Sequence, residues 1–573
     1  MKNLKWKALC IVMCLCFAVF TAYAQKNINA YNYGNEEVFP IADGLASDDE
    51  GVYVNAAQLP NGKVVSVGYL SNDVLVSVFD PQTQTATRIT LPEVISSGEA
   101  HSVIPLADNS YMIFGLGGNE VTKGLAAKID SAGNVEVLAA PASQELKRVN
   151  YVYGDVLNDG SVIVAGIGTF TNDKKQPVVV KFNTDGTSQL LNLPELVMDG
   201  GHFSDVCALA DGSFIAVGQR DSNSIPLIVK FSADGQGKVI PTPAEITNGE
   251  FMKLTKDANG NVVAVGEGRI NEEAQQIAVK IKPDESVSVF EKPSNVTNYE
   301  RVYFYHVMAQ DDGSFLASGT AEINGVETGV VVRLSDEGSL LLNPQMDLSN
   351  GLFYATKALP DGTVVSVGTA YNSISGLSEP CVIQFDTNGN GKRIAMSAEI
   401  GMLVDVIALA DGSFMVFGMS GNTQTWEIIP AVSRFTLIAH TVNFQTFDGS
   451  QVASQTLYDE GFVTIPNEPT KEGYIFEGWY TDEQCTIAYD FNSPVKSSFT
   501  LYAKWEEKLE IPSNPGNENP KDGNTTNKTP NKASEIQASV KAGDSTNKNV
   551  FFIAAVGSLM SIILLRARKR LNK

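Results

Sequence analysis

The sequence feature that most constrains the fold is an internal repeat with a period of about 50 residues. Each unit has a turn, usually with Asp-Gly or Asn-Gly, and then a short apolar run that ends in glycine. The eight copies read LPNGKVVSVG, LADNSYMIFG, LNDGSVIVAG, LADGSFIAVG, DANGNVVAVG, QDDGSFLASG, LPDGTVVSVG and LADGSFMVFG, and they begin at Leu59, Leu106, Leu157, Leu209, Asp257, Gln310, Leu359 and Leu409. Asp-Gly and Asn-Gly supply the positive φ angles of tight hairpins, so each copy predicts two strands joined by a turn.

A second landmark in each unit is an apolar strand that runs into another turn. Examples are PVVVKFNTDG from Pro177 and PLIVKFSADG from Pro226. Each unit therefore predicts four strands, which is the content of one β-propeller blade. We expect an all-β fold in which residues 25–438 form an eight-bladed β-propeller.

The two ends of the repeat array predict how the ring closes. The eighth unit supplies its third strand around 431–437 and then runs into different sequence, so it lacks a fourth strand. A strand-like segment at 37–41 precedes the first unit at the spacing of a fourth strand. We expect this N-terminal strand to complete the last blade, which would leave no open sheet edge.

The repeated turn and strand motifs resemble the delta-sixty repeats of secreted bacterial proteins over residues 35–438. The resemblance implies a propeller and says little about activity.

Residue types that recur at the same position in most units predict packing between blades. An aromatic residue stands nine positions before the turn glycine in most units, and a basic residue recurs in the third strand. The aromatic set is Tyr53, Tyr151, Phe203, Phe251, Phe304 and Phe353, and the basic set is Lys128, Lys181, Lys230, Lys280, Arg333 and Arg434. Such regularity favours packing over ligand binding, because a binding site should break the symmetry.

No catalytic, cofactor or metal site is expected from the residue pattern. The recurring aspartates lie beside the turn glycines, where turn chemistry accounts for them. They are Asp159, Asp211, Asp312, Asp361 and Asp411. His101, His202 and His306 lie at different distances from their turns, so they form no triad or metal pattern. We therefore expect a protein that is not an enzyme and needs no cofactor.

Loops of variable sequence join the second and third strands of the units. They include 169–176, 219–225, 267–275 and 369–379. These loops should emerge on one face, and variable loops on a rigid ring are where recognition is expected. Phe170, Tyr371 and Trp426 are the candidate ligand-binding aromatics on that face.

The first 24 residues have the order of a secretory signal peptide. Lysines at positions 2, 5 and 7 precede an apolar run at 8–20, and Ala22-Tyr23-Ala24 gives a cleavage site before Gln25. The cysteines that follow are Cys207, Cys381 and Cys485, an odd number with no disulfide or metal spacing. We expect export without a disulfide framework.

The C-terminus predicts an anchor. Residues 550–565 are apolar and fit one transmembrane helix, and the basic residues of 566–573 should stay in the cytoplasm. The segment at 539–544 resembles the sorting signals of Gram-positive surface proteins, although Ala542, before Gly543, replaces the usual threonine. Covalent wall attachment by a sortase and a plain membrane anchor both remain open.

Between the repeats and the anchor, residues 440–507 lose the period. They carry Val442-Asn443-Phe444, the run from Pro469 to Tyr480 that includes Gly478-Trp479, and Leu501-Tyr502-Ala503-Lys504-Trp505. This segment is similar to the Listeria/Bacteroides repeat, the B-repeat of internalins, which implies a small β-grasp-like module. Residues 508–549 are poor in aromatics and predict a disordered stalk.

These features predict a cell-surface binding protein or adhesin. It would recognise an extracellular glycan or protein and contact the membrane through its C-terminal helix. The formal net charge of −23 argues against nucleic acid as a partner. The alternatives are a propeller hydrolase or lyase that acts on extracellular polysaccharide, and a structural surface spacer.

Overall fold

The computed structural model describes residues 35–39 and 50–508 apart from short gaps. The gaps are 119–122, 144, 195–196, 198–199, 221–223, 343–347, 349, 361, 373–374, 387–388, 422, 424–427, 437–438 and 459–461. The chain divides into two compact units at Ile438 and Ala439.

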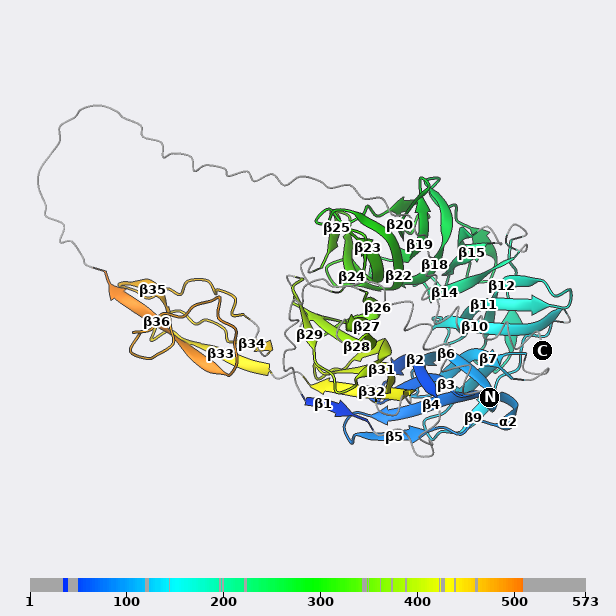
Figure 1. The fold of residues 1–573 in the computed structure, drawn as a ribbon, viewed down its shortest axis with the longest axis horizontal. Coiled ribbons are helices and arrows are strands. Elements are labelled where there is room, and N and C mark those ends of the chain that lie inside the picture. The colour runs from blue at the N-terminus through cyan, green and yellow to red at the C-terminus, as the bar shows by residue number, and fades with distance from the viewer. Residues whose placement is uncertain are drawn as a thin grey trace, which may run out of the picture. The chain divides into compact units, whose positions relative to one another are not determined.

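Four-stranded antiparallel groups make up the first unit (Figure 1). The first four groups are β2 (Gly51–Gln58), β3 (Val64–Leu70), β4 (Asp73–Asp80) and β5 (Thr85–Arg88); β6 (Gly98–Pro105), β7 (Tyr111–Gly117), β8 (Leu125–Ile129) and β9 (Val135–Val137); β10 (Leu146–Val156), β11 (Val162–Phe170), β12 (Lys175–Phe182) and β13 (Ser188–Leu190); and β14 (Gly201–Ala208), β15 (Phe214–Arg220), β16 (Ile225–Phe231) and β17 (Gly237–Val239). A short helix, α2 (Glu93–Ser96), follows β5.

The remaining groups of this unit follow the same order. They are β18 (Ile246–Lys256), β19 (Val262–Ile270), β20 (Glu273–Ile281) and β21 (Val287–Val289); β22 (Tyr299–Ala309), β23 (Phe315–Ile323), β24 (Val326–Ser335) and β25 (Gly338–Leu341); β26 (Leu352–Ala358), β27 (Val364–Asn372), β28 (Leu377–Phe385) and β29 (Gly391–Ile394); and β30 (Ile400–Ala408), β31 (Phe414–Gly421) and β32 (Ile428–Thr436) with β1 (Asn35–Val38). One bridge between Glu267 and Tyr303 joins the β18–β21 group to the β22–β25 group as a single sheet.

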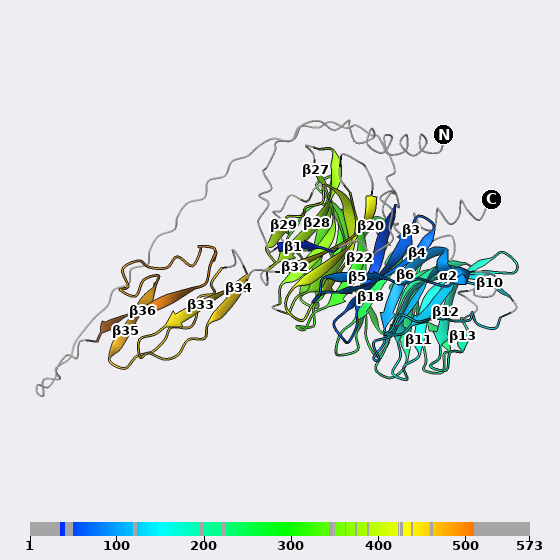
Figure 2. The ribbon, with the colours of Figure 1, turned by 90° about the horizontal axis from the view of Figure 1, so that it is seen from below.

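The groups are arranged in a closed circle. The first strand of each group contacts the first strand of the next, and β2 contacts β30 of the last group (Figure 1). These strands, from β2 through β30, are therefore the innermost strands of the ring. Figure 2 shows the ring turned by 90°, with β11, β12 and β13 of one sheet side by side.

The N-terminal strand completes the last group. β1 pairs antiparallel with β32, with Val38 opposite Ser433. The backbone N–H of Phe39 donates to the carbonyl of Val432 at 3.0 Å. The Ser433 hydroxyl donates to the Glu36 carboxylate at 2.9 Å. The edge of β32 is thus covered by a strand from the other end of the repeat array, which removes a site for pairing with another chain.

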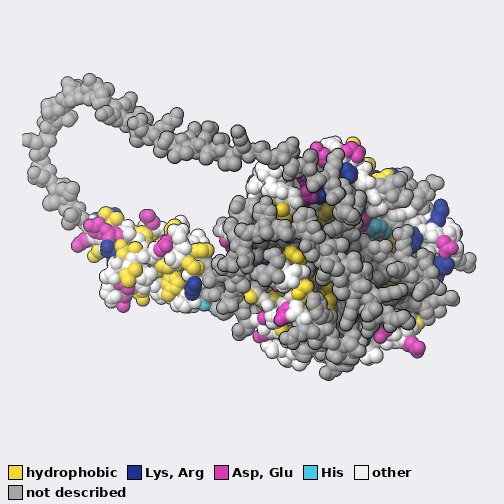
Figure 3. Space-filling view, in the orientation of Figure 1, with side chains coloured by type: hydrophobic (Ala, Val, Ile, Leu, Met, Phe, Trp, Pro, Cys, Tyr) yellow, Lys and Arg dark blue, Asp and Glu magenta, His cyan; other side chains and the backbone are white. Residues whose placement is uncertain are grey.

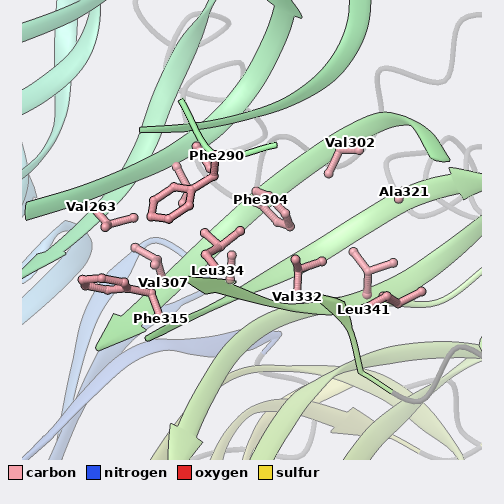
Figure 4. Close-up of a cluster of buried hydrophobic side chains, with 14 of the residues drawn as sticks. Val263, Phe290, Val302, Phe304, Val307, Phe315, Ala321, Val332, Leu334 and Leu341 are labelled. Atoms are coloured by element: carbon pink, nitrogen blue, oxygen red, sulfur yellow. The ribbon is translucent and has the colours of Figure 1, made fainter. Parts of the chain in front are cut away.

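The recurring aromatics form the cores between neighbouring sheets. The whole aromatic set, from Tyr53 to Phe353, is at most 2% exposed. Figure 4 shows one such core, in which Phe304 lies among Val263, Phe290 and Phe315. The packing role predicted for this position is confirmed.

A β-bulge follows the recurring aromatic position in the innermost strands. In β14, for example, the register shifts between Phe203 and Asp205. A bulge changes the direction of the following side chains. After it, polar side chains bind the backbone of the next innermost strand: Asp205 accepts from Leu254 N at 3.1 Å, and Asn55 accepts from Val103 N at 3.0 Å.

Some of the recurring basic residues connect neighbouring groups: Lys280 Nζ donates to Asp336 at 2.8 Å, and Arg434 donates to the carbonyl of Pro81 at 2.8 Å. Lys181 instead pairs with Asp159 of its own group at 3.0 Å. The described turn aspartates cap their own hairpins, as Asp159 does by accepting from the backbone N–H of Ser161 at 2.9 Å. Asp361 lies outside the described residues. These contacts agree with the structural roles that the repeats predict.

The second unit is a small sheet in the order β34-β33-β36-β35. Its strands are β33 (Ala439–Gln445), β34 (Gln455–Tyr458), β35 (Tyr474–Tyr480) and β36 (Phe499–Glu507), and the central pair β33–β36 is parallel. Trp479 is buried in its core, and the Trp505 indole N–H donates to the carbonyl of Thr446 at 2.8 Å. Hydrophobic side chains remain visible on the surface of this unit (Figure 3).

Several expectations fall outside the described residues. These are the signal peptide at 1–24 with Ala24 and Gln25, the segment 509–549 with Ala542 and Gly543, the apolar segment 550–565, the basic tail 566–573, and Trp426. Within the described part of the chain, no helix has the length and apolar character needed to cross a membrane.

The carboxylate of Asp405 joins the last group of the ring to the first, and a substitution there tests how much this contact contributes to stability. It is 8% exposed and accepts from Ala56 N at 2.8 Å and from Asn55 Nδ2 at 3.0 Å. We expect Asp405→Ala to lower the free energy of unfolding by about 2 kcal/mol, because a buried N–H loses its acceptor. Chemical denaturation followed by circular dichroism measures this loss.

The matched control is Asp185→Ala, which removes an exposed turn aspartate that accepts from Thr187 N at 2.9 Å. Its loss should be below about 1 kcal/mol, since water can replace the carboxylate. Equal losses in the two variants would show that the Asp405 contact does not hold the ring together.

Candidate functional site at the inner rim

The residue just before the recurring aromatic position differs from one innermost strand to the next. We call these eight residues the inner rim. They are Val52, Glu99, Asn150, His202, Glu250, Tyr303, Leu352 and Met402. The strand register places them beside the last residues of each second strand, near the connection to the third strand. The segments expected there as loops are shorter than predicted, because the two strands extend into them: only 271–272 of 267–275 and 171–174 of 169–176 lie outside the strands. The inner rim therefore breaks the symmetry of the ring next to these connections.

One pair of inner-rim residues forms an ion pair. His202 Nε2 lies 2.6 Å from Glu250 Oε1, and the Ser204 hydroxyl donates to the same oxygen at 2.9 Å. Burial lowers the pKa of His202 because it disfavours the imidazolium. The charge of the Glu250 carboxylate and its hydrogen bond have the larger combined effect, so the pKa of His202 is raised. Burial also opposes ionisation of Glu250, but His202 and Ser204 hold the pKa of Glu250 below its ordinary value. The pair is thus a charged acceptor with a fixed orientation.

A second carboxyl group stands directly opposite this pair. Glu267 of β19 is the cross-strand partner of Glu250 of β18. Like charges opposite each other in a sheet are unfavourable. Burial and the Glu250 charge raise the pKa of Glu267 to about 7. One carboxyl of the pair therefore stays ionised while the other is protonated over much of the acid range.

Tyrosine side chains flank the carboxyl pair on the next strands. Tyr303 of β22 bridges to Glu267 through the backbone, and 37% of its surface is exposed. The rings of Tyr305 and Tyr354 lie 5.6 Å apart between centroids. Burial raises the pKa of both phenols, so they remain neutral hydroxyls. An exposed ring beside a fixed carboxylate and a neutral carboxyl group can bind a sugar through stacking and hydrogen bonds.

Further along the innermost strands, a buried polar cluster fills the space between groups. Lys253 Nζ lies 3.4 Å from Asp205 and 3.2 Å from the centroid of the Tyr153 ring. Burial, together with Lys357 and Lys253, lowers the pKa of His306 well below its ordinary value. We assign Lys253, Asp205 and Tyr153 a packing role, since they pair among themselves.

The candidate aromatics from the sequence lie apart from this site. Phe170 ends β11, is half-buried and packs against the hydrophobic core next to β10. Tyr371 lies near the end of β27, opposite Ser378, and is also half-buried. The structure places these two residues on different sheets.

The sequence does not predict that His202, Glu250, Glu267 and Tyr303 lie together. The signal in the sequence is a residue that changes from repeat to repeat beside the recurring aromatic position. In the part of the chain that the structure describes, no group of three or more His, Cys, Asp or Glu side chains is placed to hold a metal ion.

Comparisons with known proteins identify two kinds of module in the chain. The family model described as the Listeria-Bacteroides repeat domain matches residues 440–504. A model described as a β-propeller domain of unknown function, DUF5122, matches residues 157–188. The chain therefore contains a Listeria-Bacteroides repeat domain, as the sequence resemblance predicted, and a segment that matches a β-propeller domain.

Two proteins of Evansella cellulosilytica match over 137 residues. One, named "Putative membrane protein", is 32% identical over 22% of this chain and 21% of its own length. The other, named "Putative Gly-rich membrane protein", is 38% identical over 22% of this chain and 16% of its own length. The match thus spans about a fifth of these relatives.

Among solved structures, a catalytically inactive virginiamycin B lyase from Staphylococcus aureus with quinupristin has a TM-score of 0.39 and 10% identity. It covers 70% of this chain and 99% of that one. YCF48 from Cyanidioschyzon merolae has a TM-score of 0.38 and 11% identity, and the alignment covers 70% of this chain and 98% of YCF48. Neither similarity is close enough to carry an argument about function.

The raised pKa of Glu267 predicts a pH-dependent stability. The folded state binds the Glu267 proton more tightly than the unfolded chain, so this stabilisation is complete below about pH 4.5 and is lost as pH rises through about 7. We expect the free energy of unfolding of the wild type to fall from pH 5 to pH 8 by up to about 3 kcal/mol more than that of Glu267→Gln, which has no carboxyl group to titrate. Chemical denaturation at each pH measures the difference, and parallel curves for the two proteins would contradict it.

Proposed function

We propose that the chain is a cell-surface binding protein, or adhesin, that recognises an extracellular glycan or protein with the inner rim and the loops beside it. In this proposal the four-stranded groups are the blades of an eight-bladed β-propeller closed by β1. The Listeria-Bacteroides repeat domain spaces the ring from the cell. The signal peptide exports the chain and the C-terminal segment anchors it to the membrane or wall.

The observation that supports recognition is the broken symmetry of the inner rim. Core positions keep the same residue type around the ring, because every pair of sheets packs in the same way. The inner rim instead carries the His202–Glu250 ion pair on β14 and β18 and the exposed Tyr303 on β22, and Glu267, with its raised pKa, stands beside it on β19. Packing alone gives no reason for this difference, whereas a ligand with its own asymmetric pattern does.

Surface placement is supported by two independent features. The Listeria-Bacteroides repeat domain resembles a module of surface proteins, and the two Evansella relatives are named as membrane proteins. Protease accessibility of the propeller on intact cells tests the orientation. Protection of the propeller from added protease would contradict surface display.

Binding is tested with the purified full-length protein on glycan and host-protein arrays. We expect a retained ligand without turnover, and Tyr303→Ala should weaken its affinity at least about tenfold through loss of stacking. Lys147→Ala, an exposed residue of β10 that pairs with Asp173, is the matched control and should bind normally. Equal binding by both variants would place recognition elsewhere, and binding to nothing would favour the spacer alternative.

The opposed carboxyl groups favour hydrolysis of a polysaccharide as a second candidate function. Two carboxyl groups whose pKa values are pushed apart are the arrangement that general acid and base catalysis needs. Glu267 would be the acid and Glu250 the base. Incubation with bacterial and host polysaccharides should then release reducing ends, with a loss of at least about 100-fold in Glu267→Gln. Retention without release in the same assay supports the binding protein instead.

A further inference from the structure

We propose that Glu99 and His101 of β6, with Asn150 of β10, form a binding site for one transition-metal ion of the Zn²⁺ class. This site lies between the second and third groups of the ring. It is separate from the Glu250–Glu267 site and does not rest on the proposed function.

The tautomer of His101 is set by the backbone. Its Nδ1 lies 2.9 Å from the carbonyl oxygen of Tyr151. A carbonyl oxygen only accepts, so Nδ1 carries the hydrogen, and the neutral ring has its lone pair on Nε2. Metal-binding histidines characteristically donate their second ring N–H to such a carbonyl, which fixes the direction of the free nitrogen.

The lone pair of His101 faces another acceptor. Its Nε2 lies 3.8 Å from Glu99 Oε2, and the imidazole is 4% exposed. Both atoms are buried and without a hydrogen-bond partner among the described residues. Two buried acceptors that face each other are costly unless a positive centre lies between them.

The His202–Glu250 pair shows what a shared proton does in the same ring. There the nitrogen and oxygen are 2.6 Å apart, which is a charge-assisted hydrogen bond. The 3.8 Å separation at His101 is too long for that bond. Two metal bonds of about 2.0–2.2 Å each place their ligand atoms about 3.4 Å apart at the tetrahedral angle and about 3.8 Å apart at an angle opened to roughly 130°, so one ion fits between the two atoms.

A further unpartnered acceptor stands on the neighbouring innermost strand, at Asn150, and the proposal includes it as the third ligand. Asn150 is the inner-rim residue of the next innermost strand and precedes Tyr151, whose carbonyl holds His101. Its Oδ1 is buried without a partner among the described residues, and the residue is 8% exposed. One imidazole nitrogen with carboxylate and amide oxygens suits a borderline ion such as Zn²⁺ or Ni²⁺, with water completing its coordination.

The test uses tag-free full-length protein treated with EDTA and then titrated calorimetrically with Zn²⁺. We expect one ion per chain, and at least a tenfold loss of affinity in Glu99→Gln and in His101→Gln. His202→Gln is the matched control, because it alters a histidine of the same ring outside the proposed site, and it should bind Zn²⁺ like wild type. Absence of Zn²⁺ binding, or equal loss in His202→Gln, overturns the proposal.

Because His101 is buried, its variant can fail to fold, and a measurement on wild type covers that outcome. Crystals soaked in Zn²⁺ should show an anomalous peak about 2.1 Å from His101 Nε2. A peak elsewhere, or a direct hydrogen bond between His101 and Glu99 without a peak, also overturns the site.

Discussion

Closure of the ring is the constraint on which the rest of this structure depends. Each sheet buries both faces against its neighbours, so an open array would leave one apolar face at each end. The chain meets this need with contacts between its two ends: β1 lies on β32, and Asp405 binds the backbone of Ala56 on the first innermost strand. The acceptor and the N–H are 349 residues apart in sequence. Closure is therefore a property of the whole ring.

Once the ring is closed, positions of the repeat divide into two kinds. Those between sheets must satisfy the same packing geometry in each group, and they keep an aromatic or apolar residue. Those at the inner rim meet only the adjacent innermost strands and the loops, so packing constrains them less. This freedom lets a histidine, a carboxylate and an exposed tyrosine occupy equivalent positions, as at His202, Glu250 and Tyr303.

The ring also contains a natural comparison between two histidines. His202 belongs to a closed ion pair with Glu250, while His101 and Glu99 leave a wider gap between buried acceptors. The difference comes from the strand that carries the carboxylate. Glu250 reaches His202 from the next innermost strand, whereas Glu99 stands two residues before His101 on the same strand. Similar residues therefore have different chemistry within one fold.

The sequence alone determined the period, the turns, the buried aromatics and the pairing of the segment around Val38 with the last repeat. It could do so because hairpins and strand patterns depend on residues close together in the chain. It also marked residues 440–507 as a module of another kind through three motifs in order, and the family model matches 440–504.

Only the tertiary structure decided which polar residues of different repeats meet. His202 and Glu250 are 48 residues apart, and His101 reaches a carbonyl 50 residues away. These contacts depend on strand register, on the bulge after the aromatic and on the angle between neighbouring sheets, none of which is encoded in a local pattern. For the same reason Phe170 and Tyr371, expected as exposed loop aromatics, are half-buried near strand ends, and Phe170 packs against a hydrophobic core.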